Sequence, residues 1–592
     1  MPDLMPHHAY LSKSDFKTGR DCPAKLWYRK RRYPNTNEDN DFLEYLAECG
    51  HLVGKIAMMR YPEGHLMDTL DLPEAAAQTA ELMQQENVVI FEPLVRVGAK
   101  LARIDVLVKR GLDCQLLEVK AKKAPELFTA KDGSGVLSKW RSYIEDVAFQ
   151  LQVAQAAHPG LNFTPYLMLT DGESKADEAR LTRHFEVTHE GKECTVEFTG
   201  TDAQRKSLCQ FLKLCDVSNE VALVADAVQA GAEALLTVVE PNAEHPRPEL
   251  TAACAKCEYR VSPETKPNGF LECWGALAEP EPHIFDLYKR DLLKGGGNKV
   301  LNQMIGEGRT SLYDVREEEW ATNPNKFYPK RQQIQLRCMR TSEEWIDPQL
   351  KEVMQRLAYP LQFIDFEFDQ PAVPHVPGVG PWGRIAFQWS LHRIAEPGAT
   401  CEHLEFLETE AEDPHPAFLQ SLKDALDLSG TILVWSSAEA STLRNLVTGR
   451  ESPGMQEWID QLDAKPGPVL DMEQLTIHHY FHPDMKGQTS IKKVFPPAWR
   501  DCGAVEALAE CEKFLELNAD GSRKDPYKLL AERHPDFPVA EGTGAILAYH
   551  ALLEGRVNGT AAETLRQQLL EYCELDTLAM RVIWEYWAER LA

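Results

Sequence analysis

Asp105, Glu118 and Lys120 combine residue types and spacing that suit chemistry on a phosphate group. Asp105 lies in the run LARIDVLV, and the run QLLEVK carries Glu118 and Lys120. Both runs predict strands, and side chains two apart in a strand share a face. A hairpin of this length can bring Asp105 beside the other two. The carboxylates can then hold Mg2+ or Mn2+, while the Lys120 ammonium orients an attacking water or steadies charge on the phosphate.

The same three residues also fit a surface strand with a Glu/Lys pair, which is common and contributes little stability. Two flanking helical runs narrow the choice, because His51 lies in ECGHLVGKIA before the strands and Gln150 lies in DVAFQLQVAQ after them. The order His, Asp, Glu-x-Lys, Gln resembles the RecB-like branch of the PD-(D/E)xK nucleases, which includes CRISPR-associated exonucleases and the AddB nuclease subunit. The resemblance implies that His51, Asp105 and Glu118 bind the metal. It also implies that Lys120 is the catalytic residue and that Gln150 supports the site.

Four of the fourteen cysteines form a second group. Cys254 and Cys257 make a Cys-x2-Cys pair, which can hold zinc as well as an iron-sulfur cluster, and Cys273 follows in LECWG. Cys22 lies far away, near the N-terminus. One N-terminal cysteine joined to three later ones resembles the iron-sulfur members of the same nuclease branch, whose cluster connects the two ends of the domain. The resemblance implies a structural [4Fe-4S] cluster on all four cysteines, with tetrahedral zinc as the alternative.

A second pair of carboxylates lies in the apolar run FIDFEF. Asp365 and Glu367 are two apart, so both face one side of the predicted strand. Two ionised carboxylates on so apolar a strand are costly to bury without a cation, which favours a metal site over a solvated acidic edge. Tyr572 and Asp576 lie four apart in the predicted helix LLEYCELDTLAMRVIWEYW and are neighbours on one helix face.

A strand Asp-x-Glu followed much later by a helical Tyr-x3-Asp resembles the tyrosine-bearing branch of the DnaQ-like DEDD exonucleases. The resemblance implies a ribonuclease H-like fold, two divalent metal ions, 3'-to-5' cleavage and a water oriented by Tyr572. Its metal ligands would be Asp365, Glu367, Asp576 and one further carboxylate. Glu439 stands at that further position in TILVWSSAEASTLRNL, and Asp471 in PVLDMEQL is the other candidate. The run KGQTSIKKV, with its surroundings, also resembles a bacterial domain of unassigned function attached to RecB-like nucleases.

The charge balance limits how the chain can bind nucleic acid. A net charge of -27 argues against a protein that coats nucleic acid with its whole surface, since such binding depends on Lys and Arg neutralising phosphates. A local basic run begins at Lys13 and ends in four consecutive cations, Arg29, Lys30, Arg31 and Arg32. It fits a solvated face or a contact with a phosphate backbone. No apolar run approaches the length of a membrane span, and no signal segment is evident, which predicts a cytoplasmic protein without a membrane partner.

The 592 residues predict more than one domain. A helix is expected at 41–59, strands at 88–97, 101–108 and 115–120, and a helix at 140–157. Later strands are expected at 361–368, 384–392 and 431–435, with a helix at 415–427 and a mostly helical end. The predicted fold class is α/β, with the following divisions: an iron-sulfur PD-(D/E)xK restriction-endonuclease-like domain at 1–283, a helical connector at 284–355, and a ribonuclease H-like exonuclease domain at 356–592.

Together these patterns favour a nuclease with two sites that hydrolyses DNA with Mg2+ or Mn2+. Single strands or ends are the expected substrates, RNA stays open, and the setting is DNA repair or defence against foreign DNA. One alternative keeps the first nuclease but makes the second half an inactive nucleic-acid-binding module, which Glu439 in place of Asp favours. The other alternative is a non-enzymatic interaction scaffold. The acidic net charge suits a protein partner that delivers the DNA.

Overall fold

The computed structural model describes residues 10–38, 40–190, 193–323, 326–436, 438–447, 453–464, 467–533, 539 and 541–592. The described residues form a mixed α/β protein that divides into two compact units. Unit 1 comprises the described residues up to Glu249 together with Cys257–Cys273 and Pro371–Trp382. Unit 2 comprises Leu250–Lys256, Trp274–Gln370 and the described residues from Gly383 onward.

The main sheet of unit 1 has six strands in the order β11-β8-β7-β6-β3-β2, and a smaller sheet has the order β1-β5-β4. Strand β7 lies antiparallel to β6 and parallel to β8. A separate hairpin pairs β9 with β10. The strands are β1 (Leu11–Ser12), β2 (His65–Leu66), β3 (Asn87–Phe91), β4 (Leu94–Val97), β5 (Lys100–Arg103), β6 (Val106–Arg110), β7 (Asp113–Lys123), β8 (Asn162–Thr170), β9 (Phe185–Glu190), β10 (Glu193–Phe198) and β11 (Leu212–Asp216).

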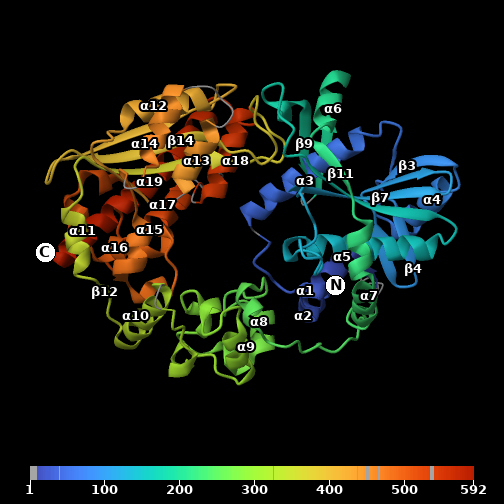
Figure 1. Cartoon of the computed structure of the whole chain (residues 1–592), viewed down its shortest axis with the longest axis horizontal. Helices are drawn as coiled ribbons and strands as arrows, with labels where there is room; N and C mark the ends of the chain where they lie inside the picture. The colour runs from blue at the N-terminus through green and yellow to red at the C-terminus, as the bar shows by residue number, and fades with distance from the viewer. Residues whose placement is uncertain are drawn as a thin grey trace. The chain divides into compact units, whose positions relative to one another are not determined.

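The helices of unit 1 cover these sheets. Helix α5 contacts α7, β4, β5 and β8 (Figure 1). Many of its side chains are buried. Helix α1 begins directly after β1 because the Ser12 side chain accepts a hydrogen bond from the Asp15 backbone N–H and caps it. The helices are α1 (Lys13–Asp21), α2 (Pro23–Lys30), α3 (Asp41–Met59), α4 (Leu72–Leu82), α5 (Ser138–Ala157), α6 (Asp202–Cys209), α7 (Ser218–Leu236) and α8 (Gly269–Trp274, whose last residue clusters with unit 2).

For two strands of unit 1, the predicted residue ranges were wrong. The run 88–97 is broken into β3 and β4, and the run 101–108 is broken into β5 and β6. Each pair of fragments lies in two different sheets. The first break falls at Glu92, whose φ of 56° is left-handed, and at Pro93, which has no N–H to donate to a ladder. The second break leaves Asp105 between β5 and β6 rather than inside a strand.

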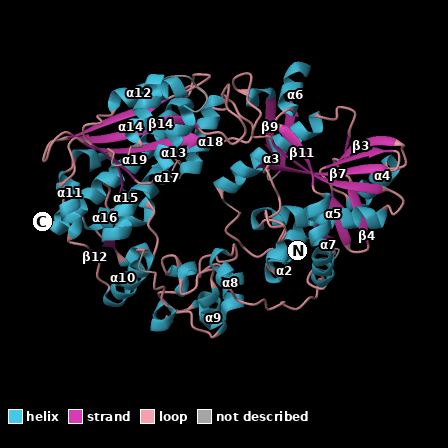
Figure 2. Cartoon of the chain, viewed as in Figure 1, coloured by secondary structure: helices cyan, strands magenta, loops and turns pink. Residues whose placement is uncertain are grey.

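Unit 2 contains one five-stranded sheet in the order β15-β14-β13-β16-β17, and a two-stranded pair of β12 and β18. Strands β13, β14 and β15 are antiparallel neighbours, while β13, β16 and β17 run parallel. Figure 2 shows strands of this sheet with helices around them. The strands are β12 (Trp345–Ile346), β13 (Leu361–Asp369), β14 (Ile385–Ile394), β15 (Cys401–Leu407), β16 (Thr431–Val434), β17 (Val469–Asp471) and β18 (Tyr480–Phe481).

Alternation along β13 divides the side chains between two hydrophobic cores. Ile364 and Phe366 pack in a core with residues of α12, α13 and α14, while Leu361 and Phe363 pack in a core with residues of α16 and α19. The helices of unit 2 are α9 (Lys299–Gly306), α10 (Tyr328–Thr341), α11 (Gln349–Gln355), α12 (His415–Ala425), α13 (Ala438–Val447), α14 (Pro453–Leu462), α15 (Met472–His479), α16 (Ile491–Asp501), α17 (Pro526–Arg533), α18 (Gly542–Leu553) and α19 (Thr560–Leu591).

Several sequence predictions agree with these elements. The helix predicted at 41–59 is α3, and the helix predicted at 140–157 is α5. The segment predicted as a separate helical connector, 284–355, differs from its prediction, because it clusters with unit 2 and supplies α9, α10, β12 and α11. Short 3-10 turns join many of the elements in both units. Among the helices that the structure describes, none has both the length and the apolar character that crossing a membrane requires.

Candidate metal centres

The first acidic site lies in unit 1, where the end of β7 meets α5. Glu118 and Lys120 share one face of β7, and the Glu118 side chain is fully buried. Gln150 of α5 is also fully buried and donates from Nε2 to Glu118 Oε2 at 2.7 Å. The backbone N–H of Val119 donates to Asp105 Oδ2 at 2.6 Å, and Lys120 forms an ion pair with Glu118. The structure therefore brings together four of the residues singled out in the sequence, Asp105, Glu118, Lys120 and Gln150.

Lys13 is a member of this site that the sequence did not reveal. Its Nζ lies 3.1 Å from Asp105 Oδ1 and 3.0 Å from Glu118 Oε2, so one ammonium bridges the two carboxylates. The sequence placed Lys13 only in a basic run. The pairing of β1 with β5 brings the start of α1 to the end of β5, and hence Lys13 to Asp105. That pairing joins residues about ninety positions apart, and a two-residue strand gives no sequence signal.

Two further carboxyl groups surround this centre. Asp146 lies one helical turn before Gln150 on α5, and its Oδ2 is 3.9 Å from Lys120 Nζ. Burial and the nearby Glu118 charge raise the pKa of Asp146 to about 7. Burial and the charge of Asp105 raise the pKa of Glu92 to about 7 as well. The i, i+4 spacing of Asp146 and Gln150 was the signal in the sequence that could have found Asp146.

The charges of the central pair are balanced by the two lysines. Burial raises the pKa of Glu118, but the ammonium groups of Lys120 and Lys13 outweigh it and bring that pKa well below its usual range. Burial and the Glu118 charge raise the pKa of Asp105. Glu118 is therefore the carboxylate that stays ionised most strongly. An ionised, fully buried carboxylate beside a second carboxyl group is a suitable pair of oxygen ligands for Mg2+ or Mn2+.

A cavity of about 500 Å³ in unit 1 connects His51 with this centre. His51 of α3, Glu92, Asp105 and Lys120 all line it, together with residues of β10. His51 is exposed at the cavity wall. The structure thus places the predicted histidine ligand on the same cavity as the carboxylates. Its role as a metal ligand stays a prediction.

The basic residues predicted to bind nucleic acid make contacts within unit 1. Lys30 Nζ lies 2.6 Å from Asp15 Oδ2, and Arg29 donates to the Thr18 hydroxyl at 3.0 Å. Arg31 stacks over the Trp27 ring at 3.9 Å from its centroid and donates to backbone carbonyls. Arg32 has a left-handed backbone with φ of 55°. Most of this run therefore serves to hold α2 in place, and phosphate binding by Arg29, Lys30, Arg31 and Arg32 stays a prediction.

Three of the four predicted iron-sulfur ligands lie in one cluster of unit 1. Cys22, Cys257 and Cys273 pack around Tyr28 and Tyr259. The Tyr28 hydroxyl lies 3.2 Å from Cys273 Sγ and 2.8 Å from His245 Nε2. The fourth cysteine, Cys254, is in the short segment that clusters with unit 2. Among the described residues, these cysteines do not form a group whose ligand atoms all lie within 4.8 Å of one another, and the iron-sulfur cluster stays a prediction.

The second acidic site lies in unit 2, between β13 and α19. One carboxylate oxygen from each of Asp365, Glu367 and Asp576 lies within 4.8 Å of the others. Glu367 and Asp576 are buried, at 8% and 7% exposure. Burial raises the pKa of Asp576, against the hydrogen bond that it accepts from the Tyr527 hydroxyl. The structure therefore brings together the predicted ligands from β13 and α19. Three hard oxygen donors at this separation fit a divalent cation.

Two tyrosines and a lysine border these carboxylates. Tyr572 lies one turn before Asp576 on α19, as the sequence predicted. Lys492 Nζ is 3.4 Å from the Tyr572 hydroxyl and 5.0 Å from the centroid of the Tyr527 ring. Burial and the Asp576 charge raise the pKa values of both tyrosines well above the usual range. Tyr527 was missed because it lies in α17, about fifty residues before its partner.

The sequence offered Asp471 and Glu439 as candidates for the fourth carboxylate of this site. Asp471 accepts a hydrogen bond from the Gln474 backbone N–H at 2.9 Å and caps α15. It is absent from the group formed by Asp365, Glu367 and Asp576 in the described part of the chain. The backbone of Glu439 lies in α13, but its side chain falls outside the described residues.

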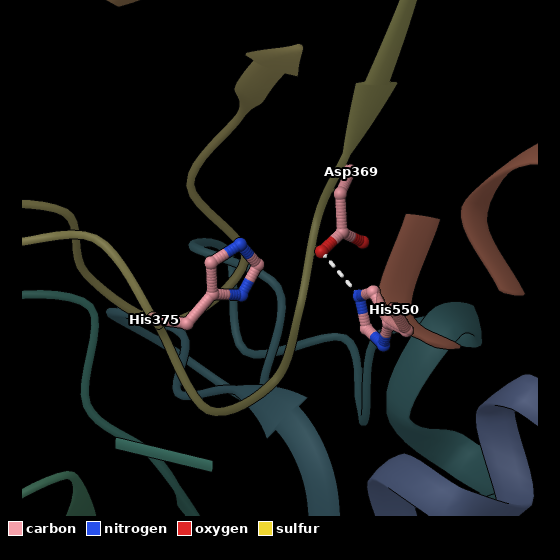
Figure 3. Close-up of side chains that lie close together, drawn as sticks. All are labelled: Asp369, His375 and His550. Carbon is pink, nitrogen blue, oxygen red and sulfur yellow. Dashed lines mark hydrogen bonds and ion pairs between the residues drawn. The ribbon is translucent and has the colours of Figure 1, made fainter. Parts of the chain in front are cut away.

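Asp369 holds a further helix against the same strand. It is the last residue of β13, and its Oδ2 lies 2.7 Å from His550 Nε2 of α18 (Figure 3). Asp369 is fully buried. The first residue of α18, Gly542, is placed so that a Cβ would stand 3.9 Å from Glu367 Oε2. The pair therefore positions α18 beside the second acidic site.

Comparison with known proteins reaches part of unit 2 and the segment Pro371–Trp382 of unit 1. Residues 362–490 match a family model described as a domain of unknown function, DUF2779. The matched segment contains β13 with Asp365 and Glu367, and it ends before the helix that carries Asp576. The chain matches none of the curated proteins and none of the solved structures with which it was compared.

Proposed function

We propose that the protein is a divalent-metal-dependent nuclease that hydrolyses DNA phosphodiester bonds, with a PD-(D/E)xK site in unit 1. The observation that carries the proposal is the contact network of Asp105, Glu118, Lys120 and Gln150. Their order along the chain suggested this chemistry. Asp105 and Lys120 line a cavity of about 500 Å³, and the buried Glu118 and Gln150 contact each other directly behind them. A surface Glu/Lys pair would not have a fully buried carboxylate held by a buried amide.

In this site the proposed metal ligands are His51, Asp105 and Glu118. A bound Mg2+ or Mn2+ supplies Lewis acidity toward a phosphate oxygen and acidifies a bound water. Gln150 fixes the Glu118 carboxylate by donating to Oε2, so that Oε1 points toward Lys120. The Lys120 ammonium is placed to orient water or to stabilise negative charge on the phosphate.

The second proposed site is a DEDD-type exonuclease site in unit 2, with Asp365, Glu367 and Asp576 as ligands and Tyr572 as the residue that orients water. A sheet with three antiparallel strands followed by parallel ones, covered by helices on both faces, is compatible with the ribonuclease H-like fold that the resemblance implies. Because Asp471 caps a helix instead of joining the carboxylates, a module that binds DNA without cleaving it is the second candidate for unit 2.

The proposed cofactor of the cysteine cluster is a structural [4Fe-4S] group on Cys22, Cys254, Cys257 and Cys273. Anaerobic purification should give a coloured protein with iron and sulfide, and Cys257→Ser should lose the colour and melt at a lower temperature. A colourless parent that carries zinc would replace this cofactor with the zinc alternative.

The proposed substrate is single-stranded DNA or DNA ends. A second cavity in unit 1, of about 590 Å³, reaches Asp146 of the first site. Its lining combines cations with carboxylates, namely Lys17, Arg20 and Arg141 with Asp21, Glu145, Asp146 and Glu258. Arg20 and Arg141 pair with Glu145, so Lys17 is the cation of this lining that we propose for contact with a phosphate backbone. An RNA strand and a protein partner that delivers DNA are further candidates to be compared in the same assays.

The test uses end-labelled single and double strands of DNA and RNA with Mn2+. The parent should cleave DNA, Glu118→Gln should lower cleavage by about 10²- to 10⁴-fold, and Asp365→Asn should abolish only end-dependent products. Asp113→Asn, an exposed carboxylate at the other end of β7, is the matched control. Unchanged cleavage in both site variants would refute the proposal, and complete loss in Glu118→Gln with no effect of Asp365→Asn would select the binding-module candidate.

A further inference from the structure

A second group of possible metal ligands lies in unit 2, separate from the carboxylates of β13. His392 of β14, His403 of β15 and Glu574 of α19 each place one ligand atom within 4.8 Å of the other two. His392 is fully buried and Glu574 is 7% exposed. The His392 and His403 rings stack with centroids 4.7 Å apart. Two imidazoles and one carboxylate form a common donor set for Zn2+.

The hydrogen bonds around the two imidazoles determine which ring nitrogens carry protons. The Thr577 hydroxyl donates its only hydrogen to the Glu574 backbone carbonyl at 2.9 Å. Thr577 therefore accepts from His392 Nδ1 at 2.8 Å and from Ser390 Oγ at 2.9 Å. Since Ser390 has then used its hydrogen, it accepts from His403 Nε2 at 3.0 Å. A neutral imidazole carries one proton, and these hydrogen bonds place it on Nδ1 of His392 and on Nε2 of His403.

This assignment leaves lone pairs on His392 Nε2 and His403 Nδ1. His392 Nε2 is buried and makes no hydrogen bond with the described residues. His403 Nδ1 lies 4.0 Å from Glu574 Oε2, the carboxylate oxygen that also forms an ion pair with Lys513. Two acceptors that face one another in a buried place are stabilised by a shared cation. Two ligands at about 2.1 Å from one tetrahedral ion lie about 3.4 Å apart, so a small inward movement closes the site.

We propose that His392, His403 and Glu574 bind a zinc-class transition-metal ion that fastens α19 to β14 and β15. Thr577 and Ser390 fix the two imidazoles by hydrogen bonds to their second nitrogens, as the outer residues of metal sites generally do. The ion would lie on the helix that also carries Tyr572 and Asp576, and would set the position of that helix on the sheet. The inference stands on this geometry and does not depend on nuclease activity.

Two cations of the described residues act on this place. The Arg581 charge acts on His392, but its guanidinium pairs with Glu585. Lys513 forms an ion pair with Glu574, and its side chain is 39% exposed. An exposed lysine can withdraw into solvent when a divalent ion binds, because its flexible stem is hydrated outside the site. Removal of the lysine should therefore strengthen metal binding, whereas removal of a ligand should abolish it.

The experiment measures metal content and cobalt spectra of the full-length protein. Chelator-treated protein is reloaded with Zn2+ or Co2+, dialysed and analysed for bound metal. His403→Phe and Glu574→Gln should each bind one equivalent less than the parent and should lose the cobalt d–d bands of a nitrogen- and oxygen-ligated site. Cobalt bound by cysteines is recognised by thiolate charge-transfer absorption and should be unchanged. His478→Phe, in α15 of the same unit, is the control.

Two further measurements keep the inference testable if one variant folds poorly. Lys513→Met should still bind the same number of metal equivalents as the parent, and it should bind Zn2+ several-fold more tightly. The loss of one equivalent in Glu574→Gln should persist in an Asp365→Asn background, which separates this ion from any metal at the β13 carboxylates. Equal metal content and identical cobalt spectra in the parent and in a folded ligand variant would overturn the inference, as would weaker binding by Lys513→Met.

Discussion

The two acidic sites differ in how the fold balances their negative charge. In unit 1, the ammonium groups of Lys13 and Lys120 contact Glu118, and the pKa of Glu118 falls well below its usual range despite burial. In unit 2, Asp576 lies within 4.8 Å of two other carboxylates, and burial raises its pKa. The first site therefore has two lysines in direct contact with its carboxylates. At the second site Lys492 contacts Tyr572, and three carboxylates gather around a place suited to an added cation.

The difference shows that a metal would perform different tasks in the two units. At the first site an incoming ion must displace or share the place of Lys13, so binding competes with an existing ion pair. At the second site an incoming ion relieves repulsion among carboxylates that are already close together. Substitutions of carboxylates should thus have opposite effects on stability in the two units.

The largest expected effect is the loss of the buried carboxylate in unit 1. Glu118→Gln should lower the free energy of unfolding by about 3 kcal/mol in chelator, because two lysines then lack their buried partner. The depressed pKa means that this contribution is complete above the unfolded pKa of about 4.3 and is lost as the pH falls through the folded pKa. Urea unfolding at pH 7 measures it, with Asp113→Asn as the control. A change below about 0.5 kcal/mol would contradict the charge-balanced description of the site.

The next effect concerns the affinity of unit 1 for metal. Lys13→Met should raise Mn2+ affinity by about tenfold, or ~1.4 kcal/mol, because the ammonium that bridges Asp105 and Glu118 is removed. Electron paramagnetic resonance of free Mn2+ measures the binding. Lys17→Met, a lysine of the same helix that lines the neighbouring cavity, is the control. Weaker binding by Lys13→Met would mean that Lys13 supports the metal site instead of competing with it.

A change of opposite sign is expected in unit 2. Asp576→Asn should raise the free energy of unfolding by about 1 kcal/mol in chelator, because it removes one of three close carboxylates and leaves an oxygen to accept from Tyr527. The same variant should lose the stabilisation that Mn2+ gives to the parent. Thermal unfolding with and without Mn2+ measures both effects. Destabilisation in chelator would remove the contrast between the two sites.

The smallest effect should come from the contact that positions α18. Asp369→Asn should lower the free energy of unfolding by about 1 kcal/mol or less, since an amide can still accept from His550 at the same place. Cleavage from DNA ends should change little, because Asp369 lies outside the group of three carboxylates. A loss of end-dependent cleavage as large as that of Asp365→Asn would assign Asp369 to the site itself.

Local patterns in the sequence predicted much of the secondary structure near the sites. Alternation predicted β13 and the common face of Asp365 and Glu367, and helical spacing predicted α5 and the proximity of Tyr572 to Asp576. These predictions succeed because side-chain direction within one element depends on backbone geometry alone. The break at Glu92 and Pro93 was missed, because an apolar run continues across it and hides the change of sheet.

By itself, the sequence determined the residue types available for chemistry and which of them share a face of a strand or helix. Only the tertiary structure decided that Lys13 bridges Asp105 and Glu118, that Tyr527 contacts Asp576, and that Asp471 caps a helix. It also brought His392, His403 and Glu574 together from two strands and a helix. The physical reason is that strand pairing and helix packing set contacts between distant segments, and these depend on the whole core, not on any local period.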